Sequence, residues 1–518
     1  MIICHQPEEL LPALQKAERQ AVEYFGNGDL FVEKYLPRAR HIEVQLMADH
    51  HGNVLHFYER ECSVQRRFQK VIEEAPSPSV NPGLREKLTS TAIQIARSIN
   101  YRNAGTIEFL LDKNGQFYFL EMNTRIQVEH PVTEMVTNTD LISLQLLVAA
   151  GNPLPMDQKD ISISGHSIEM RLCAEDAEND FHPSTGQVTL WKFPESSDSR
   201  LETYVKEGII ISPNYDSLLA KIVVCEKSRQ DAISRMQEIL SGTCISGIHT
   251  NQSFLSALAE AADFSENRMY TKYIDENLKS INALIQNQKS RIKIEYLILA
   301  YWAYYFPSGT HGKDASVWNQ IGFWRMFPTF EIQVNGDVYY CRLLNQADNI
   351  VIQINDQDNK AKFIRMVDGL LEMEINLQVE SFRFQEKMNS TEVFYKGFSF
   401  ELQSNLLIRQ VLLKQKNDFS EKVFQNLICA DLFGRVLKIN VREGDTIQAG
   451  QVLLTLESMK TEIHIVCPAE AKIKKLHTKE GESVSEKQLL LELMPPPTPP
   501  GGRGQRNENS DSIVKVDQ

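Results

Sequence analysis

Apolar residues recur at helical spacing in the first half of the chain. Two sets each fall on one helical face, the first formed by Leu10, Leu11, Leu14, Ala17, Ala21 and Val22 and the second by Leu88, Ala92, Ile95 and Ile99. A further helix is expected over residues 140–150, where Gly151-Asn152-Pro153 would end it. Strand-like stretches lie between these segments. The pattern therefore predicts an α/β or α+β enzyme core over residues 1–278.

The pattern changes to short alternating strands over residues 279–427. An aromatic-rich helix is expected at residues 292–306, closed by Pro307. Phe330, Ile332 and Val334 then alternate with polar residues, and Asn335-Gly336 predicts a hairpin turn into a strand at 338–344. Further strands are expected at 349–355, 371–379 and 393–402. This region is typical of a small β-barrel carried with one helix, and we recognise no catalytic constellation in it.

Residues 428–494 contain an internal repeat. Residues 434–457 align without gaps on residues 471–494, so that Glu443-Gly444 falls on Glu480-Gly481. A solenoid needs at least three repeats, whereas two strand-rich copies predict a β-sandwich with two-fold pseudo-symmetry. The tail at 495–518 begins PPPTPPGGRG and ends polar, which predicts disorder.

Composition narrows the class of protein. At 518 residues the chain has room for three or four domains, and its formal charge of −13 argues against a nucleic-acid binder. Its eight cysteines form no CxxC pair, which argues against a disulfide framework or a cysteine zinc site and favours a reducing compartment such as the cytoplasm. Residues 296–307 form the longest apolar stretch. This is shorter than the roughly 20 residues that a membrane span needs, and the acidic start predicts no signal peptide.

A hairpin in the first region brings acids together. Asn114-Gly115 predicts a two-residue loop that pairs Lys113 with Gln116 and sets Glu108 opposite Glu121. Opposed acids destabilise a sheet unless a cation bridges them. Strand periodicity places further polar residues on the face of Glu121, namely Asn123, Arg125, Gln127 and Glu129, and an apolar set on the other, namely Ile107, Phe109, Phe117 and Phe119. Oxygen ligands from Glu108, Glu121 and Asn123 suit Mg²⁺ or Mn²⁺; the alternative is a solvent-facing polar sheet edge.

Lys460 occupies the junction of the two repeats, between expected strands at 451–456 and 461–466. That position is a hairpin tip, and an arbitrary lysine there would be a solvated turn residue. Together with the repeat, however, the segment resembles a biotinyl/lipoyl carrier domain, whose tip lysine carries the cofactor through an amide. The Met459-Lys460 pair favours biotin over lipoate, although Ser458 and Thr461 stand where biotin carriers usually have Ala and Met.

Long motifs in the first region resemble the biotin carboxylase component of biotin-dependent carboxylases. They include EKYLPRARHIEVQ at 33–45, ERECSVQRRFQKVIEEAP at 59–76 and FLEMNTRIQVEHPVTE at 119–134, and they continue at 165–176 and 213–224. The resemblance implies an ATP-grasp carboxylase core over 1–278, a docking region of helix plus β-barrel over 279–427 and a biotinyl carrier sandwich over 428–494. The expected fold is thus multidomain α+β.

The resemblance also implies roles for individual residues. The metals would be held by Glu108 and Glu121 with Asn123 adjacent. The nucleotide pocket would be lined by Glu33, Lys34, Leu36, His41 and Gln65, and bicarbonate would be held by Lys70, Arg125, Gln127 and Val128. Glu129 would be the general base that deprotonates bicarbonate, and Arg171 would stabilise the enolate form of biotin. Taken singly, Glu129 could be a surface acid and Arg171 an ordinary salt-bridging arginine.

Two departures from the family pattern matter. Phe68 stands where the family usually has a nucleotide-contacting histidine, and a phenyl ring cannot donate a hydrogen bond. The family also normally has an N-terminal subdomain and a glycine-rich lid loop before Glu33. Here Met1 falls near the expected end of that loop, so we expect an incomplete ATP-grasp unit.

The implied protein is the biotin-containing α subunit of an acyl-CoA carboxylase, of the 3-methylcrotonyl-CoA or propionyl-CoA type with a preference for the former. No carboxyltransferase region is recognised, so the expected partners are a carboxyltransferase β subunit in a hetero-oligomer and a biotin protein ligase. A eukaryotic source would imply the mitochondrial matrix. Two interpretations stay open, an active ligase subunit and a catalytically inert chain that acts only as biotin carrier and assembly module.

Overall fold

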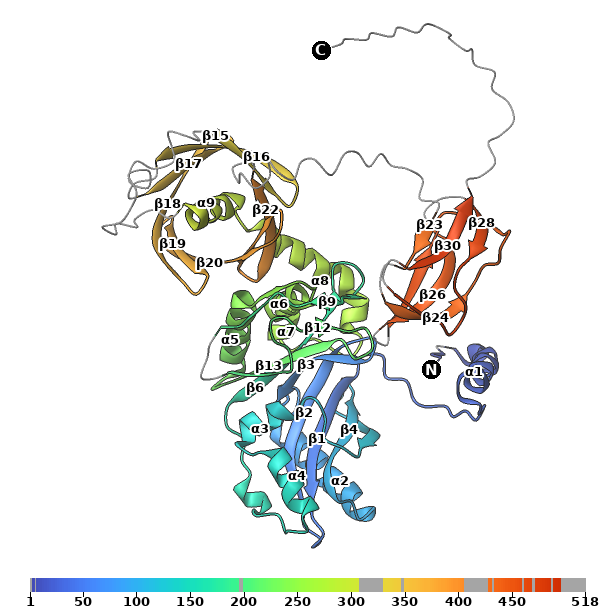
Figure 1. Cartoon of the computed structure of the whole chain (residues 1–518). Coiled ribbons are helices and arrows are strands. Elements are labelled where there is room, and N and C mark those ends of the chain that lie inside the picture. Colours follow the sequence, from blue (N-terminus) through green and yellow to red (C-terminus); the bar gives the residue numbers. More distant parts are fainter. Residues whose placement is uncertain are drawn as a thin grey trace, which may run out of the picture. The chain divides into compact units, whose positions relative to one another are not determined.

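The computed structural model describes residues 2–4, 6–194, 199–306, 329–345, 349–404, 427–430, 433–458, 461–467, 471–485 and 488–494 (Figure 1). The chain divides into two compact units, one formed by Met1–Ile211 with Ser217–Lys416 and the other by Ser212–Asp216 with Asn417–Gln518. Each unit is described by itself below. The domain boundaries expected from the sequence stay predictions.

An eight-stranded antiparallel sheet forms the centre of the first unit, in the order β11-β13-β6-β3-β2-β1-β4-β5. The strands are β1 (Arg40–Ala48), β2 (Val54–Arg66), β3 (Gln69–Ala75), β4 (Asn103–Leu111), β5 (Phe117–Asn123), β6 (His166–Cys173), β11 (Ser199–Thr203) and β13 (Leu218–Glu226). Most of these strands are buried on both faces. Successive side chains of a strand therefore pack alternately against two different layers of helices.

Helices cover both faces of this sheet. One layer packs on apolar positions such as Ile42 and Ile168 and contains α2 (Pro82–Ser98), α5 (Arg229–Gly242), α6 (Gln252–Glu260) and α8 (Tyr273–Ser290). The other layer contains α3 (His130–Thr137) and α4 (Leu141–Ala149). The remaining helices of this part are α1 (Leu10–Phe25) and the short α7 (Ala262–Ser265). The expected helix near residue 140 is confirmed, and the Asp140 side chain caps it by accepting a hydrogen bond from the Ser143 amide.

A closed barrel of eight strands follows the sheet, and helix α9 (Ile294–Tyr305) lies inside its ring (Figure 1). Its strands are β15 (Thr329–Val334), β16 (Asp337–Asn345), β17 (Ile350–Ile354), β18 (Gln357–Val367), β19 (Leu370–Ile375), β20 (Gln378–Glu386), β21 (Thr391–Tyr395) and β22 (Phe398–Ser404). Trp302 of α9 is 1% exposed and stacks on Phe330 of β15 with ring centroids 4.9 Å apart. The aromatic helix therefore supplies the core of the barrel.

Two of the single strands predicted in this region are wrong, because each is a hairpin of two strands. The expected strand at 371–379 is a hairpin, because Asn376 and Leu377 adopt positive φ values of 52° and 65° and turn the chain between β19 and β20. The expected strand at 393–402 is likewise a hairpin, turned at Lys396-Gly397 between β21 and β22. A left-handed leucine is uncommon. The polar and apolar residues alternate through the first turn, so the pattern alone did not reveal it. At the second turn, Gly397 is a local turn signal that was overlooked.

The second unit contains a sandwich of two four-stranded sheets, with orders β23-β30-β28-β25 and β27-β26-β24-β29. The predicted repeat maps onto it strand by strand, since β24 (Gly434–Ile439), β25 (Thr446–Ile447) and β26 (Val452–Ser458) correspond to β28 (Ala471–Leu476), β29 (Ser483–Val484) and β30 (Leu489–Met494). The remaining strands are β23 (Leu427–Cys429) and β27 (Thr461–Val466). Ser458 of β26 pairs with Thr461 of β27. The two residues between them, including Lys460, lie outside the described residues, as does the tail at 495–518.

Candidate active site

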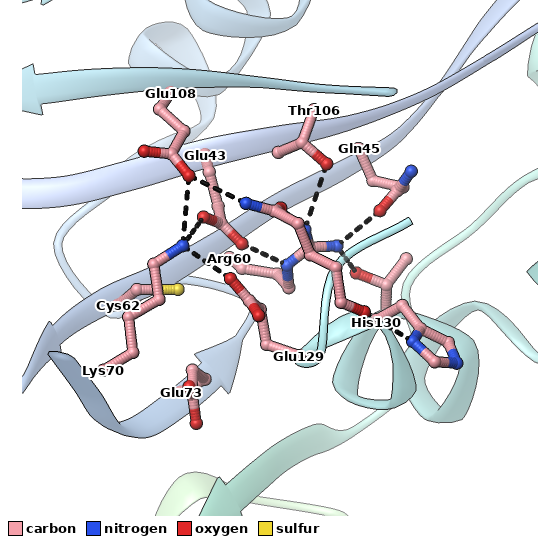
Figure 2. A network of polar contacts seen from close by, with 12 residues as sticks. Glu43, Gln45, Arg60, Cys62, Lys70, Glu73, Thr106, Glu108, Glu129 and His130 are labelled. Carbon is pink, nitrogen blue, oxygen red and sulfur yellow. Dashed lines mark hydrogen bonds and ion pairs between the residues drawn. The ribbon is translucent and has the colours of Figure 1, made fainter. Parts of the chain in front are cut away.

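Polar side chains gather on one face of the central sheet, which we call the active-site face (Figure 2). On β1, His41, Glu43 and Gln45 are buried and alternate with the apolar residues Ile42, Val44 and Leu46. Because side chains of a strand alternate between faces, the three polar residues share one face. The same face receives Arg60 from β2, Lys70 and Glu73 from β3, and Glu108 from β4. From β6 it receives Glu169, which pairs with Glu73, and Arg171, which donates to Glu73.

Three carboxylates follow one another across the strands. Glu43 of β1 pairs with Glu108 of β4, and Glu108 pairs with Glu121 of β5. The predicted opposition of Glu108 and Glu121 is therefore correct, but the predicted two-residue loop is wrong. The turn spans residues 112–116, because the Asp112 carboxylate accepts hydrogen bonds from the amides of Asn114 and Gln116. A register shift between Glu108 and Phe109 then restores the expected pairing. Phe119 pairs with the buried Phe109, as expected for the apolar face, but on the edge strand β5 it is 55% exposed.

Lys70 is the cation at the centre of these acids. Its Nζ lies 2.6 Å from Glu43, 3.1 Å from Glu108 and 2.5 Å from Glu129 (Figure 2). Burial alone would lower the pKa of Lys70, but the carboxylates, Glu43 foremost, raise it above its ordinary value. Lys70 therefore stays protonated and balances negative charge that burial would otherwise make very costly.

Glu129 lies between two cations. It is 2% exposed and directly precedes α3. One of its carboxylate oxygens accepts from Lys70 and the other from a terminal guanidinium nitrogen of Arg171 at 2.9 Å. Arg171 also donates through Nε to Glu73 at 2.6 Å. Three residues that the resemblance assigns to catalysis, Lys70, Glu129 and Arg171, are thus brought together.

Arg60 and Glu43 were missed by the sequence interpretation. Arg60 is 0% exposed, and its Nε donates to Glu43 at 2.6 Å. Its terminal nitrogens also donate to three side chains from β1, α3 and the loop before α3, namely Gln45, Thr133 and Gln127. Arg60 therefore ties the loop that carries Glu129 to the sheet. Glu43 could have been found from the alternation of His41, Glu43 and Gln45 with apolar residues.

His41 and Gln65, both expected near the nucleotide, lie in this buried network. His41 Nε2 is 3.0 Å from a Glu108 carboxylate oxygen, and its Nδ1 is 3.0 Å from Gln65 Nε2. Burial opposes the charged imidazole, yet Glu108 and Glu43 raise the pKa of His41 to about 9. The other expected nucleotide residues, Glu33, Lys34 and Leu36, lie in the strandless segment before β1 and are at least partly exposed. Lys34 Nζ donates to the Tyr118 hydroxyl at 2.9 Å.

The expected bicarbonate residues divide into two groups. Gln127 Nε2 donates to Glu108 at 2.8 Å, and the Val128 carbonyl accepts from Lys221 Nζ at 2.9 Å. Arg125 is exposed and donates to the Ile126 carbonyl. Phe68 lies at the turn between β2 and β3 with a φ of 66° and is 67% exposed.

The donor set suits a hard divalent cation. Glu108, Glu121 and Asn123 come from adjacent positions of β4 and β5, and Asn123 Nδ2 donates to both carboxylates at 3.0 and 3.3 Å. A carboxamide oxygen and two carboxylates are the oxygen ligands that Mg²⁺ and Mn²⁺ accept. His41, Glu43 and Glu108 also place one ligand atom each within 4.8 Å of one another. The residues present therefore fit a divalent metal.

Three protein-family models match the chain. The ATP-binding domain of the carbamoyl-phosphate synthase L chain matches residues 1–157, the biotin carboxylase C-terminal domain matches 169–276, and the biotin-requiring enzyme domain matches 432–493. Together they imply biotin, ATP and a divalent metal as cofactors. They cover both the active-site face and the β-sandwich.

Similar proteins extend these matches. The mitochondrial methylcrotonoyl-CoA carboxylase subunit alpha of Dictyostelium discoideum is 33% identical over 95% of this chain and 72% of that protein, and the subunit of Glycine max is 34% identical over 95% and 72%. Chloroplastic biotin carboxylase 1 of Populus trichocarpa is 44% identical over 55% of this chain and 54% of that protein. The high coverage by the alpha subunits includes the barrel and the sandwich.

Solved structures resemble the first part of the chain. The biotin carboxylase of Campylobacter jejuni has a TM-score of 0.51 at 43% identity, over 52% of this chain and 60% of that chain. The biotin carboxylase domain of the Hydrogenobacter thermophilus 2-oxoglutarate carboxylase, solved with MgADP, ADP and bicarbonate, has a TM-score of 0.52 at 42% identity, over 54% and 62%. Both support the expected ATP-grasp fold.

The fold, the site and these relatives define a biotin-dependent carboxylase, a class of ligases that use ATP. Within that class, the chain belongs to the family of methylcrotonoyl-CoA carboxylase alpha subunits. It joins a biotin carboxylase part to a biotin carrier part. Among the described residues, no helix is long and apolar enough to cross a membrane.

Proposed function

We propose that this chain uses ATP and bicarbonate to carboxylate biotin carried on Lys460. The observation that carries the proposal is the placement of Glu129, whose two carboxylate oxygens accept separately from Lys70 and Arg171. A general base must lie within hydrogen-bond reach of its substrate. The two cations next to Glu129 provide the positive charge that holds a bicarbonate anion at that point.

Each side chain has a part in the proposed reaction. Lys70, Gln127 and the backbone of Val128 hold bicarbonate, with Arg125 at the open side, and Glu129 removes its proton. Bound biotin supplies the ureido nitrogen that accepts the carboxyl group. Arg171 would supply the positive charge that stabilises the enolate form of biotin.

The metal and the nucleotide use neighbouring residues. Glu108, Glu121 and Asn123 would hold a divalent cation, which would supply positive charge to neutralise phosphate groups. The nucleotide is contacted by Glu33, Lys34, Leu36, His41 and Gln65. The 3.0 Å contact between His41 and Glu108 supports this proposal, because it joins a proposed nucleotide residue directly to a proposed metal ligand.

The acyl substrate and the partner follow from the relatives. We propose 3-methylcrotonyl-CoA as the acyl substrate and a carboxyltransferase β subunit as the partner that transfers the carboxyl group to it. The barrel with its internal helix is proposed as the docking region, and a biotin protein ligase as the enzyme that modifies Lys460. The relatives are named as mitochondrial, which favours the mitochondrial matrix for a eukaryotic source.

The test is bicarbonate-dependent ATP cleavage by the purified 518-residue chain. Turnover that disappears in Glu129→Ala supports the ligase, whereas a chain that shows no such turnover refutes it. Lys460→Arg is the matched control for the carrier. It should abolish streptavidin binding while leaving the sheet and its acids intact.

A carrier-only function is the second candidate. The observation that favours it is that the β-sandwich belongs to a compact unit of its own, with a core formed by residues such as Val436, Leu456 and Ile473. Such a unit can carry biotin whether or not the sheet of the first unit is active. Streptavidin binding without any ATP cleavage would select this function.

A further inference from the structure

Two buried glutamates meet beside Arg171 on the active-site face. Strands β3 and β6 are antiparallel neighbours, and their register places Glu73 directly opposite Glu169. Both residues are 0% exposed. Acids at directly opposed strand positions repel one another when both are ionised. Their contacts therefore decide how much charge the pair can carry.

The pair has too few partners for two negative charges. Glu73 accepts through one oxygen from Arg171 Nε at 2.6 Å, and its other oxygen has no hydrogen-bond partner among the described residues. Neither oxygen of Glu169 has a partner within that same part of the chain. Arg171 also donates to Glu129, so one cation serves two carboxylates while Glu169 contacts none. A buried carboxyl group without a partner takes up a proton instead of remaining ionised.

The neighbouring residues do not supply the positive charge that a doubly ionised pair would need. The titratable groups that face the pair are Lys70 of β3, Arg171 of β6, Lys221 of β13, Cys62 of β2 and Glu129 of the loop before α3. Lys70 is bound to three other carboxylates, and Lys221 is ion-paired with Glu202 and donates to the Val128 carbonyl. Both cations are therefore engaged elsewhere.

Electrostatics points the same way as the contacts. Burial raises the pKa of Glu73 to about 7, although Arg171 opposes the shift. Burial, with Glu73 as the nearest like charge, raises the pKa of Glu169 well above its ordinary range. Titrations of opposed acids are coupled, so the proton belongs to the pair rather than to one residue.

We propose that Glu73 and Glu169 hold one proton between them at neutral pH and that this half-ionised pair positions Arg171 against Glu129. With one negative charge, the pair anchors Nε of Arg171 and leaves a terminal nitrogen for Glu129. A second negative charge would draw the guanidinium toward the pair and away from Glu129. Neither glutamate touches a substrate, so both are positioning residues. This positioning role rests on the proposed function, whereas the shared proton does not.

The proton can be observed directly in the full chain labelled with ¹³C-glutamate. We expect the isotope-edited infrared spectrum to contain the C=O band of a protonated carboxyl group at pH 7. The band should disappear in Glu169→Gln and persist in Glu74→Gln. Glu74 is a control because it neighbours Glu73 on β3 but points to the opposite face of the sheet. A wild-type spectrum without the band at pH 7, or a band that survives Glu169→Gln, overturns the proposal. If Glu169→Gln fails to fold, Glu73→Gln replaces it, and the band should disappear there too.

The positioning role has its own readout in the pH profile of bicarbonate-dependent ATP cleavage. Glu169→Gln cannot ionise, so its loss of kcat at alkaline pH should occur about one pH unit or more above that of the wild type. Identical alkaline limbs overturn the positioning role. If the wild-type chain has no turnover, the proposed function and the positioning role fall together, while the infrared result independently decides the shared proton.

Discussion

On the active-site face of the central sheet, Glu73 of β3 lies opposite Glu169 of β6, and on the other face Glu61 of β2 lies opposite Glu74 of β3. The second pair is fully engaged. Glu61 accepts from Arg40 and from the hydroxyls of Ser63, Ser77 and Ser79, and Glu74 contacts His166 at 2.8 Å and Arg229 at 2.7 Å. The first pair has one donor, Arg171.

The difference separates structural acids from functional ones. On the opposite face, the Glu61 and Glu74 carboxylates each accept from several donors, so they hold strands and helices together. On the active-site face, carboxylates outnumber the cations that contact them, and cations such as Lys70 and Arg171 are each shared among several carboxylates. Such a site is electrostatically costly, and it has capacity left for a metal, a substrate anion or a proton.

The largest effect is expected from the buried arginine of the active-site face. Arg60→Met removes one of the two 2.6 Å partners of Glu43 and frees the loop before α3, so it should lower the free energy of unfolding by about 3–5 kcal/mol. Arg85→Met is the matched change on the opposite face. The Arg85 side chain is 22% exposed beside Glu59, and its loss should cost about 1–3 kcal/mol. Equal losses in thermal unfolding would break the comparison.

The two faces should respond to pH with opposite signs. Burial opposes ionisation of Glu74, but His166 and Arg229 lower its pKa, so its contribution to stability is present above the ordinary glutamate pKa and is lost as pH falls. Glu74→Gln should therefore cost about 1–3 kcal/mol at pH 7 and less in acid. The raised pKa of Glu169 makes the fold lose stability as pH rises, so Glu169→Gln should gain relative to wild type. Parallel pH dependences in thermal unfolding would contradict this.

A smaller effect is expected from Lys221, which positions the backbone next to Glu129. Lys221→Met removes the 2.9 Å hydrogen bond to the Val128 carbonyl. A single hydrogen bond contributes about 1 kcal/mol, so the KM for bicarbonate should rise about fivefold with little change in kcat. Steady-state kinetics measures KM and kcat separately. A change in kcat alone would show that Lys221 does not contribute to bicarbonate binding.

The smallest effect on stability is expected at the turn that joins β2 to β3. Phe68 is 67% exposed, so Phe68→His should change the free energy of unfolding by no more than about 0.5 kcal/mol. A new imidazole donor should tighten nucleotide binding about two- to tenfold if this position contacts the nucleotide. Calorimetric titration with ATP measures this, and unchanged affinity would remove Phe68 from the nucleotide site.

Period-two and repeat patterns predicted a good part of this molecule. The alternation at Phe330, Ile332 and Val334 and the repeat at 434–457 each follow from which side chains must be buried, and that requirement is local. The turns at 376–377 and 396–397 were missed because single strands were expected across them, whereas positive φ values at Asn376-Leu377 and Lys396-Gly397 reverse the chain there. The opposition of Glu108 and Glu121 was correct only because a register shift compensates for a longer turn.

The candidate site could be predicted where a continuous sequence motif contains the functional residue. Lys70, Glu129 and Arg171 were named from motifs, and the structure brings them together. Arg60 and Glu169 depend on contacts between strands distant in sequence, and nothing in their local pattern distinguishes them from other charged residues. The Glu73–Glu169 pair is identified only once the register of β3 with β6 is known and the hydrogen-bond partners of both carboxylates can be compared.

The most direct test of the account compares bicarbonate-dependent ATP cleavage in the wild-type chain, in Glu129→Gln and in Glu61→Gln, one buried acid from each face. A general base contributes roughly 100-fold or more, so Glu129→Gln should lose at least that factor in kcat. Glu61→Gln should reduce stability and retain the turnover of the protein that remains folded. Equal turnover in the wild type and Glu129→Gln, or no turnover in the wild type, would contradict the assignment of catalysis to the active-site face.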